Sequence, residues 1–405
     1  MGHPATAPAS ETQASAPSDP SRPRLKLLMV TPRYFPFVGG VEQHVAQMAR
    51  RLAADVDVTV LTTDTSGELA STEVVDGARI LRVRAWPRER DYYFAPGIYR
   101  TIRAGDWDLV HVQSYHTAVA PIAMLAALRA GVPYVLTFHG GGHSSRLRES
   151  LRSLQWAALR PLLARARKLI AVANFEVERF SAALHLPRDR FVVIPNGSDL
   201  PSVSAEETRG LRAGGRRVIV SVGRLERYKG HHRVIEAMPA VLREAPDCEL
   251  HIIGEGPYRP ELEQLVDRLG LADRVTVQAI EPSDRLAMAR ALAQSSLFVL
   301  MSEFETHPLA VIEALAAGRP ALVADTSGLS ELAQRGVARA LPLDSTTQEL
   351  ADAIVDELRN PRIVEGVSAP TWQDCARSLL ELYREVLSQE PVARRASAAA
   401  GTQEK

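Results

Sequence analysis

The chain has 405 residues, which is too long for one compact core and is typical of two domains of ordinary size with tails. Lys plus Arg and Asp plus Glu both number 48, so no net charge attracts nucleic acid, and we expect no nucleic-acid partner. The two cysteines, Cys248 and Cys375, argue against a disulfide scaffold or a zinc site and favour reduced thiols in a cytoplasmic protein.

The two ends of the chain have compositions that cannot build a core. Residues 1–23 are rich in Ala, Pro, Ser and Thr, and we expect them, like residues 390–405, to be disordered tails. The first tail lacks the basic start and apolar stretch of a signal peptide. No apolar run reaches about 18 residues, so we expect no membrane span.

The first half of the chain alternates predicted strands with predicted helices. Residues 25–30 form an apolar run that predicts a buried strand, and the following loop ends in Gly39-Gly40, directly before an amphipathic helix. We predict a helix over residues 119–130 and further strands over 56–61, 78–83, 108–112, 133–139 and 168–172. This alternation is typical of a parallel sheet, where ligands bind at the carboxyl ends of the strands.

Glycines and histidines fall at these predicted strand ends. Gly39 and Gly40 let the backbone at a helix start approach an anion, although an ordinary turn explains them equally well. His111 and His139 each lie near the end of a strand. Either histidine could bind a ligand, and either could instead be hydrogen-bonded by neighbouring groups in the protein.

A basic stretch covers residues 146–168, which contain several arginines and one acid, Glu149. A helix of this composition could lie on an anionic membrane or receive an acidic or lipid-linked acceptor. A solvated helix face is the other interpretation. The sequence therefore leaves open a peripheral contact with the inner face of a membrane.

A second group of basic residues follows a polar stretch, 201–215, that we predict to be a linker. The strand predicted over 217–222 leads into Arg224, Arg227 and Lys229, directly before a predicted helix. Cations there are unfavourable by roughly some tenths of a kcal/mol each, because the helix dipole is already positive at that end. A bound diphosphate would neutralise these positive charges. The alternative interpretation is a basic loop exposed to solvent.

Two carboxylates, Glu305 and Glu313, follow the strand predicted over residues 296–301. Pro308 suits the first turn of a helix, which places Glu313 about 7 to 8 Å along the helix axis at roughly 1.5 Å per residue. That length is comparable to a diphosphate, so the two carboxylates could bracket a nucleotide sugar. Ordinary surface contacts are the alternative interpretation.

These motifs together resemble those of a known enzyme family. Glu305-x7-Glu313, continued by Ala314, Ala317-Gly318 and Arg319-Pro320, is similar to the E-x7-E motif of the retaining glycosyltransferases of family 4. Arg224-x4-Lys229-Gly230 resembles the family's diphosphate-binding arginine and lysine, and the resemblance covers nearly the whole chain. One departure is Thr306-His307-Pro308, where the family often has Gly-Phe-Gly.

The resemblance implies an α/β protein with the GT-B fold, in which two Rossmann-like domains face each other across a cleft. The implied organisation is an acceptor domain over 24–200, the linker over 201–215, a nucleotide-sugar donor domain over 216–368, and a helix over 369–389 that crosses back to the first domain. The implied catalytic residues are His139, Arg224, Lys229 and Glu305. The implied substrate-binding residues are Gly39, Gly40, Asn196, Gly254, Glu255, Gly256, Thr306, His307, Pro308, Leu309 and Glu313.

The implied reaction moves a sugar from a nucleotide sugar, with UDP or GDP as the expected nucleotide, to a hydroxyl acceptor such as a glycolipid, polysaccharide, cyclitol or secondary metabolite. We expect no metal and no cofactor beyond the nucleotide sugar. The loop over 31–40 contains no histidine that could act as an inverting base, which favours retention. A sugar phosphorylase-like enzyme and a non-catalytic nucleotide-sugar-binding protein are the alternatives.

Overall fold

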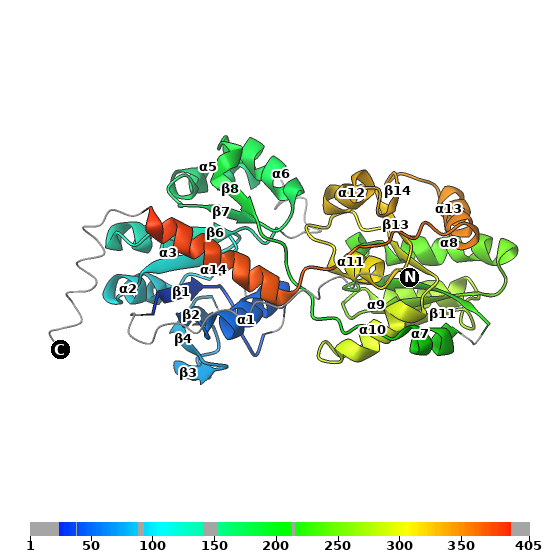
Figure 1. Ribbon diagram of the computed structural model, residues 1–405, viewed down its shortest axis with the longest axis horizontal. Coiled ribbons are helices and arrows are strands. Elements are labelled where there is room, and N and C mark those ends of the chain that lie inside the picture. The colour runs from blue at the N-terminus through cyan, green and yellow to red at the C-terminus, as the bar shows by residue number, and fades with distance from the viewer. Residues whose placement is uncertain (1–23, 38, 88–92, 141–151, 213–214, 390–405) are drawn as a thin grey trace, which may run out of the picture.

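The computed structural model describes residues 24–37, 39–87, 93–140, 152–212 and 215–389, which form two lobes, each built on one sheet (Figure 1). The predicted tails over 1–23 and 390–405 lie outside the described residues. The predicted α/β class with two parallel sheets is confirmed.

The first lobe is organised around an eight-stranded sheet with the strand order β3-β4-β2-β1-β5-β6-β7-β8. All neighbouring strands in it are parallel except the β3–β4 hairpin. The strands are β1 Lys26–Val30, β2 Asp57–Asp64, β3 Thr72–Val75, β4 Ala78–Arg84, β5 Leu109–Gln113, β6 Tyr134–Thr137, β7 Leu169–Ala171 and β8 Phe191–Val193. The helices are α1 Gly40–Leu52, α2 Pro96–Ala104, α3 Val119–Ala130, α5 Arg152–Leu163 and α6 Asn174–Leu184, with a short 3-10 turn over Arg188–Arg190.

The second lobe contains a six-stranded, fully parallel sheet with the order β11-β10-β9-β12-β13-β14. Its strands are β9 Arg217–Val222, β10 Cys248–Ile253, β11 Val275–Gln278, β12 Leu297–Leu300, β13 Ala321–Ala324 and β14 Arg339–Leu341. Its helices are α7 Ala205–Arg212, α8 His231–Glu244, α9 Arg259–Arg268, α10 Arg285–Gln294, α11 Leu309–Ala316, α12 Ser327–Gln334 and α13 Thr347–Arg359, and the 3-10 turn η2 spans Arg227–Lys229.

Both sheets are buried on their two faces, which explains why their strands appear in the sequence as continuous apolar runs. In the first lobe Leu28 and Val30 pack on one face and Leu27 and Met29 on the other, and all four are fully buried. Consecutive strands that are all parallel bring their carboxyl ends to one edge of each sheet. The loops that carry the predicted site residues therefore gather at two edges.

The stretch predicted as a linker, 201–215, differs from our expectation because it contains a helix. α7 lies within it, and Glu207 of this helix pairs with Arg290 of α10 at 2.6 Å between Oε1 and Nε. With eight residues and few apolar side chains, α7 has no periodicity that sequence reasoning could detect. Structurally, α7 belongs to the second lobe.

The last helix, α14 Trp372–Ser388, lies across the first lobe, far from the strands that precede it in the sequence (Figure 1). Thr371 and Asp374 form a capping box at its start, which satisfies backbone amides of the first turn. Its buried face, which includes Cys375 and Tyr383, packs in the same core cluster as α1 and the central strands. No described helix is long and apolar enough to cross a membrane.

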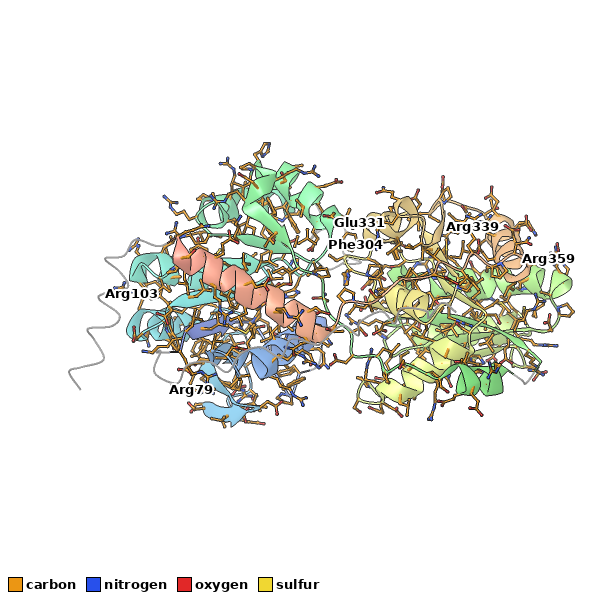
Figure 2. The ribbon with its side chains drawn as sticks, viewed as in Figure 1. Arg79, Arg103, Phe304, Glu331, Arg339 and Arg359 are labelled. Atoms are coloured by element: carbon orange, nitrogen blue, oxygen red, sulfur yellow. The ribbon has the colours of Figure 1, made fainter. Side chains whose placement is uncertain are left out.

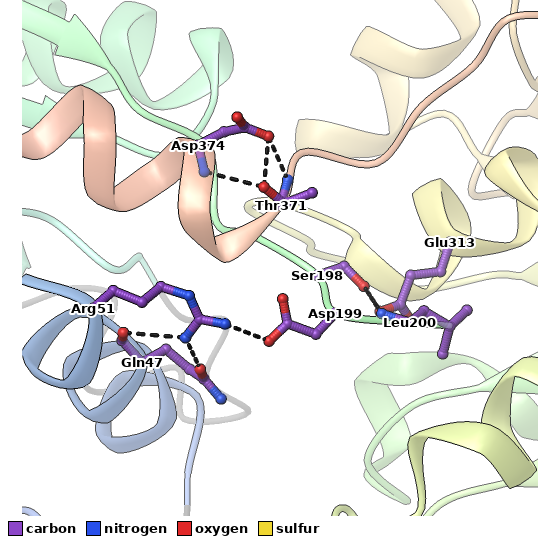
Figure 3. Close-up of polar contacts among 8 residues, drawn as sticks. All are labelled: Gln47, Arg51, Ser198, Asp199, Leu200, Glu313, Thr371 and Asp374. Carbon is purple, nitrogen blue, oxygen red and sulfur yellow. Dashed lines mark hydrogen bonds and ion pairs between the residues drawn. The ribbon is translucent and has the colours of Figure 1, made fainter. Parts of the chain in front are cut away.

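The chain passes between the lobes twice, and the two passages lie side by side. Ser198 forms a parallel bridge with Thr371, and its amide donates to Pro370 O at 2.7 Å. Asp199 pairs with Arg51 of α1 at 2.6 Å, which ties the first passage to the first lobe (Figure 3). Both connections between the lobes run through this paired crossing, which we refer to as the hinge.

Candidate active site

The loop after β9 holds two of the predicted catalytic cations in different surroundings. Lys229 Nζ lies 2.6 Å from Glu305 Oε1, and the two side chains are only 14 and 12% exposed. Arg224 is 72% exposed, and its Nη2 lies 2.6 Å from Glu226 Oε1. The structure therefore brings Lys229 and Glu305 together, while Arg224 extends into solvent beside them.

Glycines fix the course of this loop. Gly230 has a φ of +74°, and a Cβ there would lie 1.9 Å from Met301 O. A Cβ at Gly254 would lie 1.9 Å from Gly223 O, and one at Gly256 would lie 2.3 Å from Leu225 O. Gly254 and Gly256 are thus required for the β10 turn to pack against the β9 loop. Packing alone explains both glycines, so their predicted contact with substrate stays a prediction.

Glu255 takes part in the same packing through its backbone. Its carbonyl oxygen accepts a hydrogen bond from the Leu225 amide at 2.8 Å. Behind the loop, His231 opens α8 and is fully buried, with its Nδ1 2.9 Å from Ser221 Oγ. Burial lowers the pKa of His231 to about 4, so a neutral side chain supports the basic loop from inside.

Glu305 is held by backbone contacts with the start of α12. Its amide donates to Ser327 Oγ at 2.8 Å, and its carbonyl accepts from Gly328 N at 2.8 Å. A Cβ at Gly328 would lie 2.2 Å from Thr306 O, so no other residue type fits at that position without a shift. The carboxylate that faces Lys229 is therefore on a fixed loop.

The helix that carries the second glutamate begins as predicted. α11 starts at Leu309 after Pro308, and Gly318 follows its end with a φ of +73°. His307, just before it, has its pKa lowered to about 4 by burial, and its Nδ1 has no hydrogen-bond partner among the described residues. His307 is half-buried as a whole residue, and its predicted contact with substrate stays a prediction.

Glu313 is buried at 7% exposure and has two donors on one oxygen. Arg285 Nη2 lies 2.5 Å from Glu313 Oε1. The Ser198 hydroxyl donates to the same oxygen, and Figure 3 shows this second contact. The glutamate also lines a cavity of about 400 Å³ between the hinge passages, α7, α10 and α11. Sequence reasoning identified neither partner, because Arg285 and Ser198 belong to no recognisable motif.

In the first lobe, His139 follows β6 with a φ of +44° and is half-buried at the outer end of a chain of hydrogen bonds that leads into the core. Its Nε2 lies 2.8 Å from Gln113 Oε1, and Gln113 Nε2 lies 3.2 Å from His111 Nδ1. With the amide in this orientation, His139 donates from Nε2 and keeps Nδ1 as an acceptor. Burial holds the pKa of His139 well below its usual value, so the ring is neutral.

His111 belongs to the interior and not to a ligand site. It lies within β5 and is fully buried, with Nδ1 2.6 Å from the Tyr383 hydroxyl and Nε2 2.8 Å from Thr137 Oγ1. Burial lowers its pKa to about 3. Of the two interpretations of His111, the hydrogen-bonded core histidine is correct.

A third histidine, His44 of α1, connects the glycine loop to the hinge. Its Nδ1 lies 2.9 Å from Oδ1 of Asn196, a predicted binding residue that directly precedes the hinge passage. Its ring centroid lies 4.6 Å from that of His139 and 5.7 Å from that of Trp372. Burial lowers the pKa of His44 to about 4. Sequence reasoning missed His44, because a histidine inside an amphipathic helix gives no signal of a distant partner.

The predicted glycine pair opens α1, with Gly39 as the N-cap. A Cβ at Gly40 would meet no atom within 4 Å, and one at Gly39 would meet only the flexible side chain of Glu42, at 2.5 Å from Oε2. Contacts with the described protein therefore do not require a glycine at position 40. An approaching ligand would supply a reason for it.

The two lobes also meet near the predicted sugar site. The hydroxyl of Thr306 donates to the carbonyl oxygen of Gly140, the residue after His139. Thr306 was predicted to bind substrate, but its hydroxyl is engaged in this contact between the lobes. Among the described residues, no group of three or more His, Cys, Asp or Glu side chains could hold a metal ion.

The chain is similar to known glycosyltransferases along most of its length. Residues 38–201 match the family described as Glycosyltransferase Family 4, and residues 204–367 match Glycosyl transferases group 1. A D-inositol 3-phosphate glycosyltransferase of Thermobispora bispora is 27% identical over 86% of this chain and 90% of its own length. A GDP-mannose:cellobiosyl-diphosphopolyprenol alpha-mannosyltransferase of Komagataeibacter xylinus is 27% identical over 93% of this chain and 97% of its own.

Solved structures show the same fold. Anabaena Alr3699/HepE in complex with UDP superposes with a TM-score of 0.67 at 20% identity, covering 92% of this chain and 100% of that one. Its likeness establishes the GT-B architecture. The two family matches together span most of the chain, in the order that the two lobes follow. The protein thus belongs to the family 4, or group 1, glycosyltransferases.

Proposed function

We propose that the protein is a retaining, metal-independent glycosyltransferase that moves a sugar from a UDP- or GDP-sugar to a hydroxyl acceptor such as a glycolipid, polysaccharide, cyclitol or secondary metabolite. The observation that carries the proposal is the ion pair between Lys229 and Glu305, at 2.6 Å and largely buried. Relatives at 27% identity include a transferase named for GDP-mannose and one named for an inositol phosphate acceptor.

The charges of the second lobe suit a leaving diphosphate. Lys229 supplies a point charge at the start of α8, and the exposed Arg224 can leave Glu226 to form a forked contact with phosphate oxygens. Charge that develops on the leaving oxygen is stabilised by groups already in place, which lowers the barrier to bond cleavage. Positioning and electrostatic stabilisation are then the main tasks of the protein.

The proposed reaction proceeds on the same face of the donor sugar that the leaving group occupies. The bond between the sugar and the diphosphate breaks, the acceptor oxygen bonds to the same carbon, and the acceptor proton passes to the leaving diphosphate oxygen. Neutral His139 and the carboxylate of Glu305 hold the sugar hydroxyls during this exchange. Glu313 holds ribose hydroxyls, with Arg285 balancing its charge.

The acceptor side of the proposal concerns the first lobe. The basic stretch predicted to approach a membrane, 146–168, is described from residue 152 onward, and its first six residues lie outside the described residues. In α5, Leu154 is 68% exposed, as an interfacial helix requires. We therefore keep a cytoplasmic protein with peripheral contact at an anionic inner membrane face as part of the proposal.

The first test is a thermal-shift panel with UDP, GDP, ADP, TDP and their common sugars. A nucleotide at about 100 times its dissociation constant stabilises the fold by roughly 2.7 kcal/mol, which is readily detected. We expect one nucleotide class to shift the wild type and not Lys229→Ala. The matched control is Arg216→Ala, which breaks an exposed pair with Glu249 at the opposite end of β9 and should keep the shift.

The second test examines the products. With the identified donor, we expect transfer in the presence of EDTA and an anomeric configuration, read by NMR, that equals the configuration of the donor sugar. Loss of activity in EDTA that Mg²⁺ restores would contradict metal independence, and an inverted product would contradict retention. Absence of any nucleotide shift in the panel would contradict the diphosphate site itself.

A further inference from the structure

A hydrogen bond across the cleft joins two loops that each carry a predicted catalytic residue. Thr306 follows Glu305 in the second lobe, and Gly140 follows His139 in the first. The Thr306 side chain is buried, and its hydroxyl donates to Gly140 O. This contact therefore directly joins the two loops that are expected to hold the same donor sugar.

Both ends of this bond are fixed to their own lobes. On the second lobe, Gly328 packs against Thr306 O closely enough that a Cβ would lie 2.2 Å away. On the first lobe, the Gly140 amide donates to Glu176 Oε1 at 2.8 Å, and Glu176 Oε2 accepts from Val172 N at 2.9 Å. Glu176 is 1% exposed, and burial raises its pKa to about 7. The hydroxyl thus connects two loops that each have further contacts within their own lobe.

A second set of contacts lies on the same side of the molecule. Glu331 of α12 accepts a hydrogen bond from the Phe175 amide in the first turn of α6, whose N-cap residue provides no side-chain acceptor. The rings of Phe175 and Phe304 lie 5.8 Å apart, and the Arg179 guanidinium lies 5.0 Å from the Phe304 ring centre. Figure 2 shows Phe304 and Glu331 at the seam between the lobes.

These contacts join the lobes at a second place, apart from the hinge, where the Ser198 amide donates to Pro370 O. A carboxylate at the N-terminus of α6 is favourable because it meets unpaired amides and the positive end of the helix dipole. The rings and the guanidinium add apolar and cation–π contacts. The closed arrangement therefore has specific polar and apolar support from both lobes.

Thr306 lies directly after Glu305, and a residue without a side-chain hydroxyl at this position could not make the bond to Gly140 O. We propose that Thr306 is a positioning residue, whose hydroxyl holds Gly140 across the cleft so that Glu305 and His139 face one donor sugar. The inference rests on the proposed function, because it assigns the contact to the assembly of that site. A smaller closed population would weaken donor binding in proportion.

The test compares Thr306→Val, which keeps the shape but loses the hydroxyl, with Thr306→Ser, which keeps the hydroxyl. We expect the valine variant to lose about 2- to 10-fold in kcat/KM for the donor, mainly through KM, as removal of one neutral hydrogen bond implies. The serine variant should recover most of that loss. Equal losses in both variants would overturn the proposal, because they would trace the effect to side-chain shape.

Small-angle X-ray scattering without any donor tests closure independently of the reaction. Thr306→Val should increase the radius of gyration, and Thr306→Ser should not. The matched control is Thr326→Val, which removes a hydroxyl-to-carbonyl bond of 3.0 Å to Ser302 O within the second lobe and should leave the radius unchanged. An unchanged radius for Thr306→Val, with the protein folded, would overturn the proposal whether or not glycosyl transfer is found.

Glu331→Ala provides a second variant on the same seam. It removes the acceptor for the Phe175 amide without touching either predicted sugar-binding loop. We expect the same direction of change in the radius of gyration as for Thr306→Val, and a larger change in the double variant. The wild type and every variant could lack glycosyl transfer while the radius of gyration changes as expected. In that case the proposed function is wrong, and the role of Thr306 in holding the two lobes together is still supported.

Discussion

The two sides of the cleft differ in the charge of the side chains that they present. The second lobe places ion pairs at its edge, with Lys229 on Glu305 and Arg285 on Glu313. The first lobe presents the buried His44 and the half-buried His139, whose rings lie 4.6 Å apart, and among the described residues no carboxylate is hydrogen-bonded to either ring. The difference matches what each side is proposed to meet, a charged diphosphate on one side and neutral hydroxyls on the other.

The neutrality of the first lobe has a clear physical cause. Burial without an opposite charge disfavours the protonated ring, and it lowers the pKa of His44 to about 4 and of His111 to about 3. In the second lobe, by contrast, Glu305 lies beside Lys229 and Glu313 lies beside Arg285, each in an ion pair. Removing a cation from the second lobe should therefore reduce kcat/KM far more than removing one hydrogen bond from the first lobe.

The largest expected effect is that of Lys229→Met on catalysis. The variant leaves the Glu305 carboxylate, 12% exposed, without its partner and removes a charge proposed to stabilise the leaving group. We expect kcat/KM to fall by about 100- to 1000-fold. Steady-state kinetics on the donor identified by the panel would measure it. The control Arg216→Ala should keep kcat/KM near the wild-type value. A loss of less than about 10-fold for Lys229→Met would contradict the proposal that this cation stabilises the leaving diphosphate.

The next effect concerns pH and the first lobe. Because the pKa of His44 is about 4 in the folded protein and its ordinary value is 6.5, the unfolded chain binds more protons between these values. The free energy of unfolding is therefore unaffected by the titration of His44 above pH 6.5, and it decreases as the pH falls from 6.5 towards 4. At pH 5 the loss amounts to about 2 kcal/mol, at about 1.4 kcal/mol for each pH step.

Denaturant unfolding at pH 7 and pH 5, with His44→Gln as the comparison, measures this loss. Other buried histidines, such as His231 and His307, contribute to the slope of both proteins, so the difference between the two slopes isolates His44. We expect the variant to be less stable at pH 7 and to lose less on acidification. If both proteins lose the same free energy of unfolding between pH 7 and pH 5, His44 takes up its proton normally in the folded state. That result would contradict a neutral His44 in the first lobe.

Much of the second lobe could be predicted from the sequence. The apolar run over β9 and the glycine after α11 both follow local rules, and so does the placement of Lys229 and Glu305 at the carboxyl ends of two strands of one parallel sheet. Short-range patterns determine these features. The pairing of Lys229 with Glu305 then follows from the strand order β9-β12, in which the two loops are neighbours.

The features that could not be predicted depend on contacts between distant segments. His44 meets Asn196, which is 152 residues away, and Ser198 meets Glu313 at a separation of 115 residues. No periodicity or motif encodes such a pair, because it arises only when two lobes and a hinge take their places. α7 was missed for another reason, since its eight residues bury too little apolar surface to show a pattern.

Glu313→Gln should have an intermediate effect, about 10-fold in donor KM with kcat nearly unchanged. The amide weakens the proposed contact with ribose hydroxyls and leaves Arg285 without its charged partner. A double-mutant cycle with Arg285→Ala sharpens the test. If Arg285→Ala alone reproduces the whole effect and the double variant adds nothing, Glu313 serves to hold Arg285, and the ribose contact is wrong.

The smallest effect is expected from Tyr383→Phe, at the inner end of the first lobe's hydrogen-bond chain. The variant loses the 2.6 Å bond to His111 Nδ1, but Gln113 Nε2 remains 3.2 Å from that nitrogen, so no buried acceptor is left unpaired. We expect about 1 kcal/mol less stability in denaturant unfolding and an unchanged donor KM. A raised donor KM would instead mean that α14 influences the position of His139 through His111 and Gln113. The crossing helix would then contribute to donor binding in the first lobe.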